Sequence, residues 1–134
     1  MTPKEVSRSL EEKYGLIPSP GLIKYAELKK ELAAINNRLS AAMAEKGIPM
    51  ELAETLFAAM RCDKEGKSSP SEIARILDLP PTTISSRLKR MEELGWAARE
   101  MDSLDRRSLF VRLLPLGIEM ARTAWETYSQ VLDH

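Results

Sequence analysis

Apolar residues recur every three or four positions along most of the chain, the spacing expected of amphipathic helices. The longest such pattern spans residues 22–46 and stops at Gly47, a residue that favours a helix C-terminus. Its apolar positions are Tyr25, Leu28, Leu32, Ile35, Leu39 and Ala42. A stripe of this length either packs inside the chain or pairs with a second chain, and we favour pairing.

A short helix is predicted ahead of this stripe. Val6, Leu10 and Tyr14 follow one another at a spacing of four, and Gly15 ends the pattern. The prolines at 18 and 20 interrupt any helix beyond it. Residues 1–21 are therefore predicted to form an N-terminal extension that holds a short helix and a linker.

After the long stripe, a helix is predicted to begin at Pro49, which suits the first helical position, and to run to about Arg61. Its buried face is predicted to comprise Leu52, Leu56, Phe57 and Met60. A polar loop, residues 61–68, follows. Ser69 and Glu72 then match a capping box, in which each side chain bonds the backbone N–H of the other residue, so another helix starts there.

This next helix is short and is followed at once by a longer one. Its inward residues are predicted to be Ile73, Ala74, Ile76 and Leu77. Residues 78–81 break it, and the longer helix runs from about Pro81 to Leu94, with Gly95 after it. The inner face of the longer helix comprises Ile84, Leu88 and Met91. Two helices joined by a tight turn are the pattern of a helix-turn-helix.

The opposite face of the longer helix carries hydroxyl and basic side chains. At about 100° per residue, this face comprises Thr82, Ser86, Lys89 and Glu93, flanked by Thr83, Ser85 and Arg90. Arg87 falls nearer the inner face, where it either packs along the edge of the core or contacts DNA.

Two strands and a last helix complete the pattern. Residues 96–101 and 108–114 predict a hairpin with a polar tip, and Pro115 starts a helix that runs to about residue 132. The apolar positions of that helix are Ile118, Ala121, Trp125, Tyr128 and Leu132. The fold class is therefore mainly α with a small β-hairpin wing, and the winged helix-turn-helix spans about residues 49–114.

Composition argues against an enzyme. The chain has 134 residues, which suit one domain, and its 43% hydrophobic content is typical of a globular protein without a membrane span. One histidine and one cysteine leave no constellation for catalysis, a metal or a cofactor. Charges of both signs surround Cys62, so we expect an inert thiol rather than a redox sensor. A cytoplasmic location is expected, since no signal peptide or disulfide framework is evident.

Positive charge is local rather than global. The formal net charge is +0, although phosphate neutralisation supplies most of the affinity of a nucleic-acid binder. Residues 67–112 nevertheless carry nine basic and seven acidic side chains, and residues 79–91 carry three basic and no acidic ones. The basic excess therefore falls on the predicted helix-turn-helix. A protein-interaction module of the same fold, such as an antirepressor or an assembly adaptor, stays the alternative.

Residues 71–117 resemble the MarR family of transcriptional regulators. Ser71–Ala74 resembles the family's helix start, Met91–Gly95 its close to the recognition helix, and Asp105–Arg107 the Asp-Arg-Arg of its wing. The helices within residues 22–61 fit the family only in outline. The resemblance implies a homodimer whose two recognition helices enter successive major grooves of a pseudo-palindromic operator, usually as a repressor and in some relatives with a small-molecule effector.

The resemblance also implies which residues bind double-stranded DNA. The candidates for the major groove are Thr82, Thr83, Ser85, Ser86 and Lys89. Lys89 and Arg90 are expected to contact phosphates, the alternative being a solvated charged face. Arg106 and Arg107 would contact DNA from the wing, with Asp105 orienting them by ion pairing, unless the three form only a solvated turn.

The resemblance further implies a MarR-like domain at 22–134 with dimerisation helices at about 22–46 and 115–132. Three departures qualify it. Ser86 stands where the family often has arginine, and Leu114 stands where a threonine usually caps the last helix. The family commonly continues past the position of His134 into a further helix, so we expect residues 1–21 to take its place in the dimer. Trp125 and Tyr128 are expected in core or dimer packing rather than in a ligand pocket.

Overall fold

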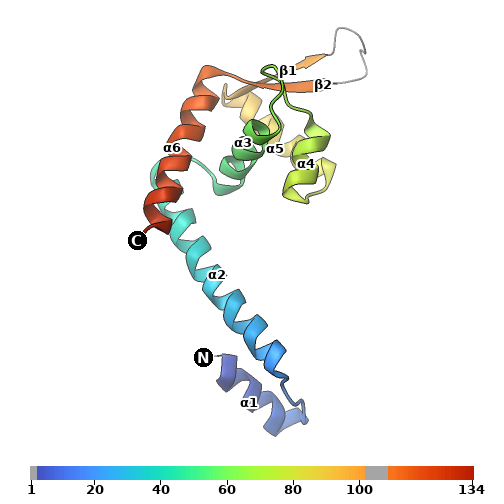
Figure 1. The fold of residues 1–134 in the computed structure, drawn as a ribbon, viewed down its shortest axis with the longest axis vertical. Helices are drawn as coiled ribbons and strands as arrows, with labels where there is room; N and C mark the ends of the chain where they lie inside the picture. The colour runs from blue at the N-terminus through green and yellow to red at the C-terminus, as the bar shows by residue number, and fades with distance from the viewer. Residues whose placement is uncertain (1–2, 102–108) are drawn as a thin grey trace. The chain divides into compact units, whose positions relative to one another are not determined.

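Six helices and one hairpin make up residues 3–101 and 109–134, the part of the chain that our computed structural model describes (Figure 1). In chain order they are α1 Pro3–Tyr14, α2 Pro20–Glu45, α3 Met50–Arg61, α4 Pro70–Leu77, α5 Pro81–Glu93, β1 Ala97–Met101, β2 Leu109–Leu113 and α6 Pro115–Leu132. The prediction of a mainly helical winged fold with one small hairpin is confirmed. Within the described ranges, no helix is both long and apolar enough to cross a bilayer.

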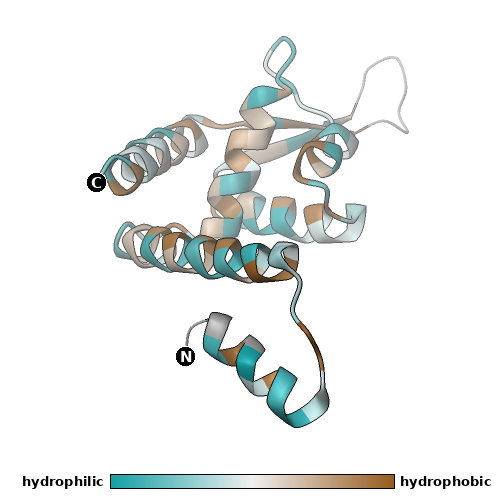
Figure 2. Cartoon of the chain, turned by 60° about the horizontal axis from the view of Figure 1, so that its bottom comes forward, coloured by the Kyte–Doolittle hydropathy of each residue, from teal (hydrophilic) through white to brown (hydrophobic). Residues whose placement is uncertain are grey.

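The chain forms two compact units, residues 1–38 and 39–134. The first unit holds α1 and most of α2. Gly15 ends α1 with a φ of 67°, and the Ser19 hydroxyl accepts the backbone N–H of Leu22 at the start of α2. Apolar residues recur along α2 (Figure 2), yet the side chains of Tyr25, Leu28 and Leu32 are exposed. These side chains are thus not covered within the first unit, and the pairing of the stripe with a second chain stays a prediction.

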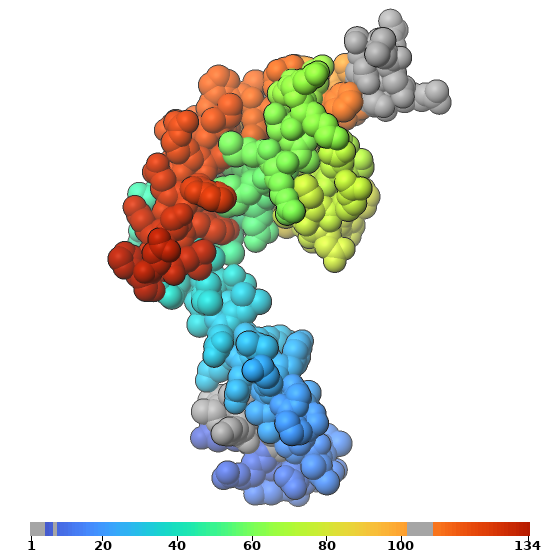
Figure 3. Space-filling model, viewed as in Figure 1, coloured from blue at the N-terminus to red at the C-terminus, as the bar shows by residue number. Residues whose placement is uncertain are grey.

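The second unit is built around α3, which packs against α4, α5 and α6. The red surface of α6 lies beside the green surface of α3 in Figure 3. The last turns of α2 contribute Leu39 and Met43, which are buried there. Burial of these apolar surfaces is the main stabilising contribution to such a unit. The larger fully buried side chains of the core are Met43, Ile48, Leu52, Leu56, Ile73, Ile84, Leu88, Met91 and Val111.

The predicted buried face of α3 is right except at its end. Leu52 and Leu56 are fully buried and Phe57 is half-buried, as expected. Met60 is 45% exposed, because the buried face continues through Ala59, and the next residue lies about 100° further round the helix. The sequence pattern alone did not distinguish these two apolar neighbours.

The predicted capping box at the start of α4 is wrong, although the helix starts where expected. The Ser69 hydroxyl lies 2.8 Å from the Ser71 hydroxyl and makes no cap hydrogen bond to the helix. The Glu72 carboxylate lies 3.8 Å from Lys64 Nζ. Pro70 occupies the first turn, where it needs no N–H partner and its fixed φ suits a helix.

The segment predicted as a polar loop joins the edge of the hairpin. Ser68 and Val111 exchange both backbone hydrogen bonds at 2.8 Å, and the buried Ser68 hydroxyl donates to the Ala59 carbonyl at 2.6 Å. Ser68 therefore ties the end of α3 to β2. The pairing joins residues far apart in the sequence, so local patterns gave no sign of it.

The hairpin runs directly from α5 and into α6. β1 and β2 pair antiparallel, from Ala97 opposite Leu113 to Met101 opposite Leu109. Gly95, at a φ of 77°, lets the Trp96 N–H reach the Met91 carbonyl at 2.8 Å and so closes α5. The Trp96 carbonyl in turn accepts the N–H of Leu114 at 2.9 Å, just before α6 begins without a side-chain cap, as predicted.

Gly117 allows α6 to start this close to the hairpin. A Cβ on Gly117 would overlap the Trp96 carbonyl oxygen and lie 2.9 Å from its carbonyl carbon. Both are backbone atoms that the hydrogen bonds around Trp96 hold in place. The Trp96 backbone therefore has no room to move away from a side chain at position 117.

We expect Gly117→Ala to lower the free energy of unfolding by about 1–3 kcal/mol, the usual cost of overpacking, measured by urea denaturation. Gly21→Ala is the matched control, because its nearest contact would be the Ser19 hydroxyl at 4.0 Å. Since alanine favours helices, the control should not lose stability. A Gly117→Ala protein as stable as the parent would show that the close approach is not limiting.

Candidate nucleic-acid interface

The helix-turn-helix consists of α4 and α5 joined by a tight turn. Asp78 ends α4 in the left-handed region with a φ of 53°, and the Leu79 N–H reaches back to the Ala74 carbonyl at 3.0 Å. Pro81 then starts α5 in the first helical turn. The predicted inner face of α5 is confirmed, because its residues Ile84, Leu88 and Met91 are buried.

The opposite side of α5 forms an exposed ridge, which we define as Thr82, Ser86, Lys89 and Glu93. Of the other predicted site residues on this helix, Ser85 and Arg90 are exposed and Thr83 is half-buried. Lys89 makes no ion pair with any described residue. The ridge therefore presents two hydroxyls, the Lys89 ammonium group and the Glu93 carboxylate to solvent.

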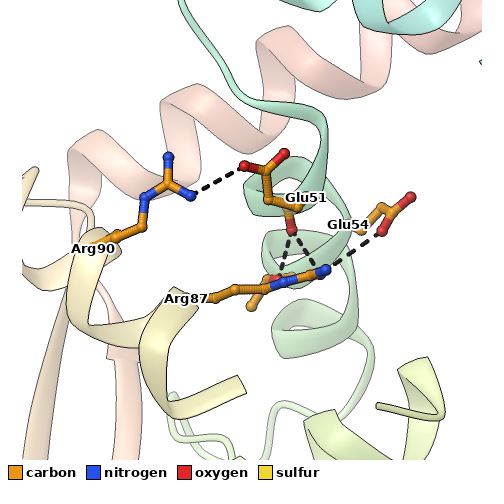
Figure 4. Close-up of polar contacts among 5 residues, drawn as sticks. Glu51, Glu54, Arg87 and Arg90 are labelled. Atoms are coloured by element: carbon orange, nitrogen blue, oxygen red, sulfur yellow. Dashed lines mark hydrogen bonds and ion pairs between the residues drawn. The ribbon is translucent and has the colours of Figure 1, made fainter. Parts of the chain in front are cut away.

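One flank of α5 is fixed to α3 by Arg87. Its guanidinium donates to the backbone carbonyl of Glu51 at 3.1 Å and to the Thr55 hydroxyl at 3.4 Å, and lies 3.8 Å from the Glu54 carboxylate (Figure 4). The Arg87 side chain is only 17% exposed. Of the two alternatives for Arg87, packing along the core edge is the one that the structure shows. Its contacts orient α5 on α3.

Arg90 lies on the same flank, one turn further along α5. Its guanidinium donates to Glu51 Oε1 at 3.0 Å (Figure 4). The pKa of the Glu51 carboxyl is lowered by a hydrogen bond from the backbone N–H of Glu51 and by the hydrogen bond from Arg90. This carboxylate is therefore charged at neutral pH. The predicted phosphate contact of Arg90 stays a prediction, and its cation already has an acidic partner.

The other flank of α5 is fixed to the wing. Arg99 of β1 pairs with the Glu92 carboxylate and donates to the Ser85 backbone carbonyl at 3.1 Å. α5 is thus held by arginines on both sides, from its own Arg87 to α3 and from Arg99 of β1. The exposed ridge lies between the two flanks.

The base of the wing carries its own charge cluster. Arg112 of β2 donates two hydrogen bonds to the carboxylate of Glu100 on β1, at 2.6 and 3.2 Å, and Lys67 lies 3.6 Å from the same carboxylate. The hydrogen bond from Arg112 lowers the pKa of Glu100. This bidentate ion pair connects β1 to β2 through their side chains.

The predicted wing-tip residues cannot be placed. Asp105, Arg106 and Arg107 fall in residues 102–108, outside the described residues. The strands on either side of them are described, and β1 and β2 lead into the tip from the cluster at Glu100. The roles of the three residues stay predictions.

An apolar groove of about 520 Å³ lies between α3 and α6, and we call it the α3–α6 groove. Its lining residues are Phe57, Met60, Ile118, Ala121, Arg122, Trp125 and Glu126. Trp125 is 65% exposed and contacts Phe57 edge-on, with ring centroids 5.5 Å apart, so packing in the core of this chain is wrong for Trp125. Tyr128 packs on the same ring at 5.3 Å and is half-buried, as core packing predicts.

Cys62 is half-buried near the end of α3. Burial raises the pKa of the Cys62 thiol, which disfavours the reactive thiolate. This environment agrees with the expectation of an inert thiol. Its slow reaction with alkylating reagents would follow from the same cause.

The sequence missed the residues that orient α5. Glu51, Glu54 and Thr55 were assigned to no site, and Arg99 was assigned only to a strand. The one available signal was an arginine near the inner face of a helix, which needs polar partners on a neighbouring element. Which element supplies them depends on packing.

The sequence model of the MarR family matches residues 50–108, from the start of α3 into the wing. The sequence has no significant match among curated proteins. AbsC, a MarR family transcriptional regulator from Streptomyces coelicolor, is 21% identical with a TM-score of 0.75, over 87% of this chain and 79% of that one.

Two further solved structures share the fold. The S. aureus MepR–DNA complex is 19% identical with a TM-score of 0.72, over 81% of this chain and 80% of MepR. CouR from Rhodococcus jostii RHA1, bound to p-coumaroyl-CoA, is 18% identical with a TM-score of 0.69, over 78% and 71%. Residues 50–108 thus match the MarR family of winged helix-turn-helix transcriptional regulators, and the chain shares the fold of solved members of that family.

Proposed function

We propose that this regulator is a homodimeric repressor that inserts the α5 ridge of each subunit into the major groove of a pseudo-palindromic operator. The observation that carries the proposal is that α5 is fixed on both flanks, by Arg87 to α3 and by Arg99 of β1, while its ridge stays exposed. A helix held at a defined angle can present the same side chains to successive base edges.

The chemistry of the ridge suits base reading by hydroxyl groups. Thr82 and Ser86 can donate to or accept from a base edge, and the threonine methyl can contact a thymine methyl. Lys89 supplies a cation for a phosphate or a guanine. Because Ser86 replaces the arginine often found there in the family, we expect the operator to depend less on bidentate guanine contacts at this position.

The proposed dimer is supported by apolar side chains that this chain leaves exposed. Tyr25, Leu28 and Leu32 are exposed on α2, and Leu132 is exposed on α6. Large apolar patches in water mark interaction surfaces. We propose that helices 22–46 and 115–132 form the interface together with residues 1–21.

We further propose, in place of the expectation that Trp125 serves only core or dimer packing, that a small aromatic or acyl effector in the α3–α6 groove releases the protein from its operator. The groove combines the rings of Phe57 and Trp125 with the Arg122 guanidinium at its edge. Among the relatives, CouR was solved with p-coumaroyl-CoA, and Bordetella bronchiseptica BpsR is described as regulated in DNA binding by 6-hydroxynicotinic acid.

Selection of bound sequences from random or genomic DNA tests the central proposal, because it examines binding, symmetry and target together. A two-fold symmetric motif, with affinity that falls steeply with salt, is the expected result. Failure to bind any fragment at low salt would instead favour the protein-interaction module.

We expect Thr82→Ala with Ser86→Ala to weaken operator binding by about 1–3 kcal/mol for each base edge that the helix no longer bonds. Non-specific binding should hardly change, since neither side chain is charged. The measurement is a titration of operator and random duplexes. Ser40→Ala, an exposed serine on α2, is the matched control. A parallel weakening on both duplexes would show that the ridge does not read sequence.

We expect Arg106→Ala with Arg107→Ala to lower affinity and to reduce the dependence of log K on log salt concentration by about one unit for each phosphate that is no longer neutralised. Both changes remove a cation from the wing tip. Affinity measured at several salt concentrations decides the matter. If slope and affinity stay as in the parent protein, the arginines form only a solvated turn.

We expect Leu28→Ser with Leu32→Ser to weaken self-association by at least about 2 kcal/mol, or about 30-fold, because apolar surface no longer leaves water. Removal of residues 1–17 should also weaken the dimer. Lys30→Ser, an exposed polar site about 200° round the same helix from Leu28, is the control. Sedimentation at micromolar concentration reports the change, and a parent protein that is monomeric there would rule out the proposed dimer.

A further inference from the structure

The ion pair between Glu51 and Arg90 borders the exposed ridge of α5. Arg90 follows Lys89 directly, and its guanidinium lies 3.0 Å from Glu51 Oε1 (Figure 4). The two side chains are 47% and 43% exposed. An ion pair this accessible to water contributes little to stability, so holding the fold together does not account for its position.

Arg87 and Arg90 differ in how firmly they are held. Arg87 bonds a backbone carbonyl and a buried hydroxyl, and most of its side chain is covered. Among the described residues, the one partner of Arg90 is the carboxylate of Glu51. A DNA phosphate is chemically equivalent to that carboxylate as an acceptor for a guanidinium. Arg90 can therefore exchange partners, whereas Arg87 is fixed.

Sequence-independent affinity for DNA depends on the number of cations that reach phosphates. α5 carries three basic residues, Arg87, Lys89 and Arg90. Arg87 is packed against α3 and Arg90 is paired, so Lys89 is the basic residue of α5 that no described carboxylate neutralises. The interface thus presents less charge than its sequence suggests. This arrangement also fits a chain with a net charge of +0.

We propose that Glu51 limits the affinity for DNA: its carboxylate holds the Arg90 guanidinium away from the phosphate backbone and thereby keeps the sequence-independent part of DNA binding weak. This inference rests on the proposed function, since it requires the α5 ridge to face DNA. Glu51 and a DNA phosphate compete for the Arg90 guanidinium. The Glu51 carboxylate neutralises Arg90 and also repels a phosphate that approaches. The sequence-independent affinity for DNA therefore depends on a residue of α3, outside the recognition helix.

The test compares the full chain with its Glu51→Gln, Arg90→Gln and doubly substituted variants on a random-sequence duplex and on the selected operator. Affinity is measured at several salt concentrations. Glu51→Gln should strengthen random-duplex binding several-fold at low salt and steepen the salt slope by about 0.9 for each freed cation. Arg90→Gln alone should leave the slope close to that of the parent protein. The double variant should return to the parent slope.

Glu119→Gln is the matched control for the loss of a carboxylate. Glu119 lies 3.2 Å from Arg122 on α6, so the substitution also separates an exposed Arg–Glu pair, away from α5. Because Glu119 lies on the proposed dimer helix 115–132, sedimentation first verifies that this variant dimerises as the parent does, and its slope should then stay at the parent value. Circular dichroism of each variant verifies folding, and Arg90→Gln tests the coupling independently of Glu51→Gln.

Four results would overturn the inference. If Arg90→Gln flattened the salt slope by the same amount in the parent protein and in the Glu51→Gln variant, Arg90 would contact phosphate already in the parent protein. If Glu51→Gln and Glu119→Gln had equal effects, only overall charge would matter. If the parent protein bound DNA and Glu51→Gln left the slope unchanged, Glu51 would have no such role while the proposed function stood. Absence of DNA binding by the parent and every variant would reject the proposed function as well.

Discussion

The orientation of α5 on the rest of the helix-turn-helix is the constraint on which the DNA interface depends. Apolar burial of Ile84, Leu88 and Met91 fixes the depth of the helix in the core. Burial of this one face also sets which side of the helix points outward. Arg87 and Arg99 add directional bonds that hold α5 at a defined angle, because guanidinium groups bond in a defined plane. The ridge is the side of α5 that stays exposed, because the inner face is buried and both flanks are bonded to neighbouring elements.

The wing is joined to the core through backbone contacts. Ser68 connects the end of α3 with β2, and the Trp96 carbonyl connects the end of α5 with the start of α6. Gly117 is needed at the second junction because α6 passes over the Trp96 backbone. The hairpin therefore starts from a defined place, which matters for a wing that is proposed to reach the groove beside the one read by α5.

Charge is distributed so that a neutral chain can still bind an anionic polymer. The two flanks of α5 pair arginines with glutamates, and the base of the wing pairs Arg112 with Glu100. Such pairs orient side chains and add little attraction for phosphate. We propose that the attraction comes from Lys89 and from the arginines predicted at the wing tip. A binder with few uncompensated cations relies on base contacts for its affinity, and this favours discrimination between sequences.

The sequence by itself determined the order of the elements, because hydrophobic spacing, helix stops and prolines are local properties. It gave the bounds of α2, α3, α5 and α6 within a few residues, the inner face of α5 and its hydroxyl-bearing outer face. Tertiary structure decided what touches those faces. The partners of Arg87, Arg90 and Arg99, the pairing of Ser68 with Val111 and the exposure of Met60 all arise between segments distant in the chain. Local spacing cannot encode them, since hydrogen-bond partners and buried neighbours are set by how the helices pack.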